Sequence, residues 1–340
     1  MRSIAFFNNK GGVGKTTLVF HLAAMFSEMG LRVLAVDLDP QSNLSAMCID
    51  DLDMLEWFDA ADSRNTLFGA VEPIMDGLGD YYLPKPYAVN ERFGLLVGDL
   101  GLSRYEDFLA EAWSTIFDQR RDALLKTTAF ARIQAQAAMQ WEADLVLIDV
   151  GPNLGALNRA ALIGADDVII PLAPDLFSIQ ALRNLGPTLR SWRSGWRDRR
   201  YRFASPPFAI PIGRMEPLGY VVMQHAMRLD RPVLAYGRWM AQIPTTYERF
   251  IQNREGTPGL DARQDSNCLA MLKNYRSLMP LAMDAHRPMF MLTPGDGAIG
   301  AQQDAVRSCY RDFEELAKTV AARIGLQLPL YDVTVSARQR

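Results

Sequence analysis

The ten residues 8–17, Asn-Asn-Lys-Gly-Gly-Val-Gly-Lys-Thr-Thr, combine glycines, lysines and hydroxyl groups in a pattern that suits phosphate chemistry. An apolar run at 4–7 precedes them, and a helix is expected from about Thr16 to Met29. Glycines let successive backbone N–H groups converge on an anion, and the start of a helix adds unpaired amides. We therefore predict a phosphate cradle that comprises Gly11, Gly12, Val13, Gly14, Lys15, Thr16 and Thr17.

Acidic residues follow two apolar runs that read as buried parallel strands. The run 32–36 leads into Asp37 and Asp39, and the run 145–148 leads into Asp149. Ligands bind beyond the carboxyl ends of strands in such sheets, where carboxylates can handle Mg²⁺ and water. In this interpretation Lys15 neutralises phosphate charge, while the Thr16 hydroxyl and Asp149 hold the metal ion.

The glycine-rich segment departs from the general pattern G-x-x-x-x-G-K-[ST] in one place. Asn9 stands where the first glycine belongs, and Lys10 adds a second lysine just inside the loop. The string from Lys10 to Thr17 resembles the deviant Walker A motif of the ParA/MinD superfamily of dimeric ATPases. Residues 37–43 resemble that family's D-x-D-P-Q-[GA]-N segment, and 165–175 resemble its A-D-x-V-I-I-P strand. The resemblance covers roughly 1–50, 93–190, 206–250 and 305–326.

This resemblance implies a slow, partner-stimulated ATP hydrolase that uses ATP and Mg²⁺ and forms a homodimer when it binds ATP. Lys10 would reach the phosphates of the partner subunit, Asp39 would assist hydrolysis, and Asp37 would lie near the metal. Residues 239–244 resemble the family's last strand, which would put Ile243 and Pro244 beside the adenine. Where the family more often has D-T-P-P, this chain has Val150 and Gly151 after Asp149.

Composition limits the other classes of function. With 340 residues, 49% hydrophobic content and a formal net charge of −3, the chain is globular and is not a polycation. Any affinity for nucleic acid must therefore come from a local patch. The three scattered cysteines indicate reduced core thiols. With neither a signal peptide nor an apolar run of membrane-spanning length, we expect a cytoplasmic protein.

The predicted fold is one α/β domain over 1–326, with a doubly wound, mainly parallel sheet and helices on both faces. Seven strands are expected, at 4–7, 32–37, 93–97, 144–149, within 165–175, at 208–212 and at 239–244. Further helices are expected at 103–113, 120–140, 178–189 and 303–324. Residues 51–90 and 252–304 form extra regions, the first read as a loop with a short helix, and 327–340 form a tail.

A basic stripe between 190 and 202 is the candidate surface for non-specific DNA. Arginine suits phosphates, and the three aromatic residues in the stripe could stack or anchor it. The alternatives are a solvated loop, or salt bridges to the acidic stretch 50–62. The arginines concerned are Arg190, Arg193, Arg197, Arg199, Arg200 and Arg202.

Three functions fit these patterns. The leading one is a ParA-like partition or positioning ATPase that binds DNA, and hence the nucleoid, in its ATP state and is reset by a protein partner. A second is a switch subunit of another multiprotein system, such as phage defence or mobile-element maintenance. A third, a MinD-like membrane-surface ATPase, would need a basic amphipathic C-terminal helix, whereas 328–340 contain Pro329 and alternate like a strand.

Overall fold

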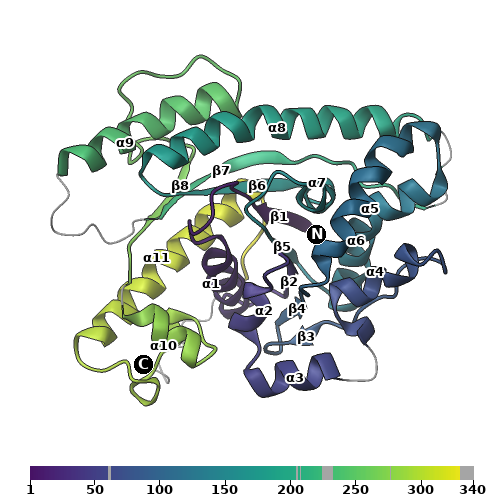
Figure 1. The fold of residues 1–340 in the computed structure, drawn as a ribbon. Coiled ribbons are helices and arrows are strands. Elements are labelled where there is room, and N and C mark those ends of the chain that lie inside the picture. Colours follow the sequence, from purple (N-terminus) through teal and green to yellow (C-terminus); the bar gives the residue numbers. More distant parts are fainter. Residues whose placement is uncertain (60–62, 204–205, 207, 224–232, 276, 330–340) are drawn as a thin grey trace.

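An eight-stranded sheet forms the centre of the molecule (Figure 1). The computed structural model describes the whole chain except residues 60–62, 204–205, 207, 224–232, 276 and 330–340. The strand order is β3-β4-β2-β5-β1-β6-β7-β8, and every pairing except that of β3 with β4 is parallel. The strands are β1 (Arg2–Phe6), β2 (Val33–Leu38), β3 (Tyr87–Ala88), β4 (Phe93–Leu96), β5 (Leu145–Val150), β6 (Asp167–Leu172), β7 (Glu216–Met223) and β8 (Cys268–Leu272).

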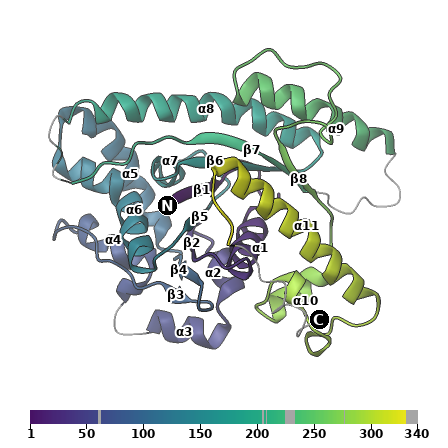
Figure 2. The same ribbon diagram turned by 180° about the vertical axis from the view of Figure 1, so that it is seen from behind.

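Helices cover both faces of this sheet, which confirms the doubly wound α/β prediction (Figures 1 and 2). The α-helices are α1 (Lys15–Glu28), α2 (Asn43–Cys48), α3 (Asp51–Asp59), α4 (Leu67–Met75), α5 (Leu102–Thr115), α6 (Arg121–Gln140), α7 (Ala156–Ile163), α8 (Leu176–Arg200), α9 (Val233–Thr246), α10 (Leu278–Asp284) and α11 (Ala301–Ile324). Short turns complete the set: η1 (Ser63–Asn65), η2 (Ile116–Asp118), the π-helical η3 (Tyr247–Ile251), η4 (Met289–Met291) and η5 (Pro294–Asp296).

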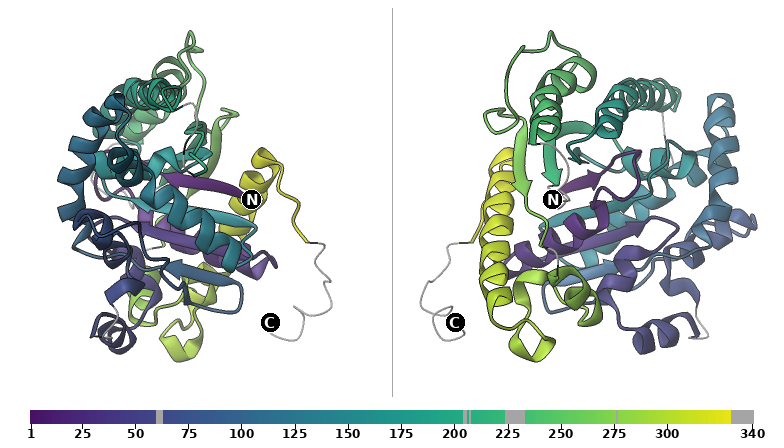
Figure 3. Two further views of the ribbon diagram at one scale, coloured as in Figure 1. Left: turned by 90° about the vertical axis from the view of Figure 1, so that its right-hand side faces the viewer. Right: turned by 60° about the vertical axis from the view of Figure 1, so that its left-hand side comes forward.

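The first strand shows why the chain needs two helical layers. Successive side chains of a strand point to opposite faces, so a strand buried on both sides is apolar throughout. Ile4 and Phe6 join a cluster with α1, α2, α10 and α11, whereas Ala5 and Phe7 join a cluster with α4 to α9. Figure 3 shows the sheet between these layers, with the yellow α11 on one side and the blue helices on the other.

Two predicted strands are wrong. Residues 208–212 form no strand, and the next strand, β7, begins only at Glu216. Residues 239–244 lie inside helix α9, because Met240, Ile243 and Tyr247 recur at helical spacing and are fully buried together on one face. The sheet ends instead with β8, which pairs with β7.

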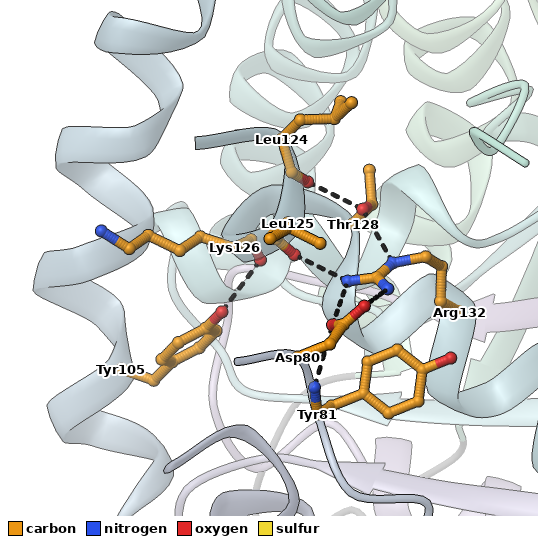
Figure 4. A network of polar contacts seen from close by, with 8 residues as sticks. All are labelled: Asp80, Tyr81, Tyr105, Leu124, Leu125, Lys126, Thr128 and Arg132. Carbon is orange, nitrogen blue, oxygen red and sulfur yellow. Dashed lines mark hydrogen bonds and ion pairs between the residues drawn. The ribbon is translucent and has the colours of Figure 1, made fainter. Parts of the chain in front are cut away.

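The first extra region is folded, with helices α3 and α4 and strand β3, rather than a loop with one short helix. It is fastened to α6 by the guanidinium of Arg132 (Figure 4). That group donates to both carboxylate oxygens of Asp80 at 2.5 and 2.9 Å and lies 4.6 Å from the Tyr81 ring. It also donates to Thr128 Oγ1 at 3.1 Å, a bond within α6 that helps to fix the guanidinium.

The predicted helices at 16–29, 103–113, 120–140 and 303–324 are confirmed within one or two residues. The helix expected at 178–189 is longer and runs to Arg200, so most of the basic stripe is helical. The second extra region supplies β8, α10, η4 and η5. Among the described residues, no helix has the length and apolarity that crossing a bilayer requires. Of the predicted tail 327–340, only 327–329 are described.

Candidate nucleotide-binding site

The loop between β1 and α1 has the backbone geometry of a phosphate cradle. Gly12 and Gly14 adopt φ angles of +69° and +82°, which favour glycine. Asn8, fully buried, holds the start of the loop, because its Oδ1 accepts from the Lys10 amide at 2.9 Å and its Nδ2 donates to the Pro171 carbonyl at 2.6 Å. Helix α1 then begins at Lys15, so its free amides point toward the same loop.

The strand register brings the predicted acids to this loop. Asp37 at the end of β2 is the neighbour of Asp149 at the end of β5, and Asp149 also pairs with Phe6 of β1. These three strands are adjacent in the sheet, so their carboxyl ends meet where the glycine-rich loop starts. Asp37, Asp39 and Asp149 therefore form one acidic group beside Lys15.

Asp149 is a fully buried carboxyl group near the end of β5. Neither of its oxygens has a hydrogen-bond partner of normal geometry among the described residues. Burial, and then the nearby Asp37, raise its pKa to about 8, while the Thr16 hydroxyl and Lys15 act in the opposite direction. A carboxylate and a hydroxyl in this position are the oxygen ligands that Mg²⁺ prefers, so these residues fit the metal.

Lys15 is itself largely buried, and burial lowers its pKa, while the charges of Asp149 and Asp39 oppose that effect. Lys15 is thus a largely buried ammonium at the start of α1, where free helix amides favour an anion.

Asp37 is engaged in the protein itself. Its Oδ2 accepts from the Ser45 amide at 2.8 Å and from the Ser45 hydroxyl at 2.7 Å. The same hydroxyl accepts from the Gly98 amide at 2.9 Å. Burial raises the pKa of Asp37 to about 7, and the bonds from Ser45 limit the rise. Asp37 thus anchors the start of α2 while it lies beside Asp149.

Asp39 lies where the loop that follows β5 passes the loop that follows β2. Its Oδ1 accepts from the Gln41 amide at 3.0 Å, and a side chain at Gly151 would place its Cβ 3.4 Å from that oxygen. The Asn158 amide fixes this second loop, because its Nδ2 donates to the Gly151 carbonyl at 2.8 Å and to the Asn153 carbonyl at 2.7 Å. Because residue 151 is a glycine, which differs from the family's more usual D-T-P-P pattern, this position puts no side chain over the Asp39 carboxylate.

Lys10 pairs within its own chain in this structure. Its ammonium contacts the carboxylate of Asp175 and lies 5.9 Å from the ring of Phe177. Asp175 also caps helix α8, because its Oδ1 accepts from the Ser178 amide at 2.9 Å. The lysine that distinguishes this loop is thus held at the N-terminus of α8, at the edge of the cradle.

Two other groups of predicted residues lie elsewhere. Ile243 and Pro244, expected beside the adenine, are buried in α9, and Ile243 belongs to the core beneath α8, so they stand at no strand end. The arginines of the stripe divide into two sets. Three are engaged with the protein (Arg190, Arg193 and Arg199), and three are exposed (Arg197, Arg200 and Arg202).

Several positioning residues were missed by sequence reasoning. Asn8, Ser45, Asn158 and Asp175 act through bonds to segments far away in the chain or to main-chain groups whose direction the sequence does not reveal. Only Asn8 carried a signal, because it stands next to the glycine-rich loop.

Comparisons with known proteins agree with this geometry. Residues 1–198, more than half of the chain, match the family described as AAA domain. The chromosome-partitioning ATPase Soj of Thermus thermophilus is 31% identical over 199 residues, which cover 58% of this chain and 66% of Soj. The chain spans about half to two thirds of the length of the curated relatives it matches.

Solved structures resemble the fold over nearly the whole chain. Protein DIP2308 of Corynebacterium diphtheriae superposes with a TM-score of 0.70 at 23% identity, covering 95% of this chain and 99% of that one. The septum site-determining protein MinD of Pyrococcus horikoshii, solved with Mg-ADP, gives 0.57 at 18% identity, with 95% and 97% covered. The family match, the partition relative and the shared fold lead to one conclusion: the chain belongs to the ParA/MinD superfamily of P-loop ATPases.

Proposed function

We propose that this protein is a Mg²⁺-dependent ATP hydrolase that forms a homodimer when it binds ATP. The observation that carries the proposal is Asp149, a buried carboxylate without partners of normal geometry, beside Lys15 and Thr16 at the mouth of a glycine-rich loop. Thr16 and Asp149 would hold Mg²⁺, which supplies positive charge to the phosphates. Loop amides and Lys15 would bind the phosphates, and Asp39 would orient the attacking water.

The surroundings of the loop support a second copy of the chain as the partner. Gly11 and Gly12 are exposed, and Leu176 and Phe177 next to Asp175 are 46% and 70% exposed. Large apolar side chains at the rim of a phosphate site are suited to burial against another protein surface. In the dimer, Lys10 would exchange Asp175 for the phosphates of the nucleotide held by the facing subunit.

Hydrolysis and mass measurements on four proteins test this proposal. Relative to wild type, Lys15→Ala should lose ATP binding, and Asp39→Ala should bind ATP and dimerise without turnover. Lys10→Ala should bind ATP, keep its thermal stabilisation by the nucleotide, and remain a monomer in light scattering. A wild-type protein that is neither stabilised by Mg-ATP nor able to hydrolyse it would refute the proposal.

We further propose that the ATP-bound dimer binds DNA without sequence preference through the exposed arginines of α8. Arg197 and Arg200 project from the last turns of that helix, and Arg202 follows it. The indoles of Trp192 and Trp196 are buried and pack the helix onto the domain, so they are not available to stack on bases. Contacts of arginine with phosphates alone carry no sequence information.

This surface is tested by measuring the binding of duplex DNA with ATP, with ADP and without nucleotide, over a series of salt concentrations. Replacing Arg197, Arg200 and Arg202 by Ala should weaken binding and flatten the salt dependence by up to about 0.9 per contact removed. The matched control removes three exposed arginines elsewhere, Arg263, Arg307 and Arg311, and should bind like wild type.

Absence of DNA binding in a protein that still dimerises on ATP would exclude the DNA surface. It would favour a protein partner at the two folded extra regions instead. An activating partner that stimulates turnover is part of the proposal in either case, because a timing device requires slow intrinsic hydrolysis and a signal that resets it.

A further inference from the structure

Two arginines from different helices contact the same indole ring. The guanidinium carbon of Arg159, on α7, lies 4.1 Å from the centre of the Trp113 ring, and that of Arg199, on α8, lies 3.9 Å from it. Trp113 belongs to α5, and its carbonyl accepts from Arg199 Nε at 2.8 Å. We call these three residues the arginine–tryptophan stack. It joins three helices that lie next to one another on one face of the sheet (Figure 1).

One end of the stack is tied to the nucleotide site. Arg159 follows Asn158, whose amide holds the Gly151 and Asn153 carbonyls of the loop after β5. That loop begins after Val150, the residue that follows Asp149, and approaches Asp39 at Gly151. Helix α7 has only eight residues and is attached to the loop by these hydrogen bonds, so we expect the helix and the loop to move together. Arg159 is therefore connected to this loop through the adjacent Asn158.

The other end of the stack lies within the basic end of α8. Arg199 is only 7% exposed and donates to the Trp113 and Gly195 carbonyls at 2.8 and 2.9 Å. Its neighbours Arg197 and Arg200 are exposed, and Arg202 lies 4.8 Å from the Phe117 ring that Arg199 also contacts. Arg199 is thus the buried member of a group of arginines whose exposed members form the proposed DNA surface.

Nearby carboxylates offset the positive charge of the stack only in part: Glu106 acts on Arg159, and Asp198 acts on Arg199. In the part of the chain that the structure describes, neither Arg159 nor Arg199 forms an ion pair with a carboxylate within 4.0 Å. Burial, and then the charge of Arg199, lower the pKa of Arg159 to about 10, and burial lowers the pKa of Arg199 to about 10. The two guanidinium groups repel each other, so the distance between them affects the stability of the stack and its attraction for anions.

From these contacts we propose that the arginine–tryptophan stack couples the nucleotide loop to the DNA-binding end of α8. Nucleotide-dependent movement of α7 shifts Arg159 against Trp113, and Trp113 transmits the shift to Arg199 and the exposed arginines. This inference rests on the proposed function, and it adds the physical route by which ATP would control DNA affinity. The size of the coupling free energy is RT times the logarithm of the ratio of the DNA dissociation constants in ADP and in ATP.

That ratio is the quantity to measure, on a fluorescent non-specific duplex, in wild type and in variants of the stack. Trp113→Leu and Arg159→Gln should each reduce the ratio by at least about threefold, within the range seen for residues along coupling routes. Trp113→Phe keeps a ring that a guanidinium can contact and should retain most of the ratio. Thermal stabilisation by Mg-ATP, measured in parallel, should be unchanged because no contact joins the stack to the cradle in the described part of the chain.

A charge-matched control separates coupling from simple loss of positive charge. Arg183 is exposed on α8, contacts Phe250 at 5.7 Å and lies outside the stack. Arg183→Gln removes one positive charge, as Arg159→Gln does. It should leave the ratio unchanged, even if it weakens DNA binding equally in the presence of ATP and of ADP.

The outcomes distinguish the two proposals. An unchanged ratio in both Trp113→Leu and Arg159→Gln would overturn the coupling and leave the DNA-binding function in place. Equal DNA affinity of the wild type in ATP and ADP would overturn the coupling and the ATP dependence of DNA binding, and would leave DNA binding itself in place. A wild type that binds no DNA in any nucleotide state would overturn the DNA-binding function, and the coupling with it.

Discussion

His21 joins the helix of the phosphate cradle to the second extra region, and its titration should be visible in the stability of the protein. The ring is fully buried inside α1. Its Nδ1 lies 2.7 Å from the Thr17 carbonyl, and its Nε2 lies 3.0 Å from the Met289 amide, which must donate. The ring is therefore neutral, with the proton on Nδ1. Protonation of Nε2 would destroy the bond from Met289 and place a charge among Phe290 and Phe313.

The size of the effect follows from the pKa. Burial lowers the pKa of His21 from its ordinary 6.5 to about 4, and the bond to Thr17 opposes the shift only in part. Between these two values the unfolded chain binds a proton that the folded chain does not, so stability rises with pH in this window. Above pH 6.5 the titration of His21 costs the folded protein almost no stability. It lowers the free energy of unfolding by about 2 kcal/mol between pH 7 and pH 5, and by about 3 kcal/mol between pH 7 and pH 4.

The assay is urea unfolding of wild type and His21→Gln at pH 7, 6 and 5, followed by far-ultraviolet circular dichroism. Other titrating groups, including Asp37 and Asp149, are common to both proteins, so their pH dependence cancels in the difference. We expect the stability advantage of the wild type to shrink by about 2 kcal/mol from pH 7 to pH 5. A difference that stays constant over this range would show that His21 does not titrate as a buried neutral ring, and would refute the reasoning.

Three further predictions concern the cradle and the layer above it. Gly14→Ala should abolish thermal stabilisation by Mg-ATP, because φ is +82° and the new Cβ would lie 2.9 Å from Met223 Cε; persistence of that stabilisation would contradict it. Asp149→Asn should raise the melting temperature without nucleotide, since it removes a buried carboxylate whose pKa is about 8, and should make stabilisation by ATP insensitive to EDTA. Gly186→Ala should cost about 2 kcal/mol in urea unfolding, because its Cβ would meet the Phe250 carbonyl at 1.8 Å. Gly237→Ala in α9, with nothing within 4 Å, is its control and should be neutral or stabilising.

The sequence by itself determined the cradle and the elements that are strongly periodic. Residues 8–17 could be interpreted because glycine, lysine and threonine act there through local chemistry, between a strand and a helix that adjoin them in the chain. The acids at Asp37 and Asp149 could be placed together because parallel strands end at the same edge of a sheet. Helices α5, α6 and α11 were predictable because their apolar faces repeat over three or more turns.

Only the tertiary structure decided the rest, because contacts between distant segments were needed. A short apolar run such as 239–244 fits a strand or a helix equally well, and packing beneath α8 selects the helix. Six arginines in thirteen residues look alike in the sequence, whereas the folded chain buries Arg199 against Trp113 and exposes Arg197 and Arg200. The pairing of Lys10 with Asp175, 165 residues away, likewise exists only because β1 and β6 are neighbours in the sheet.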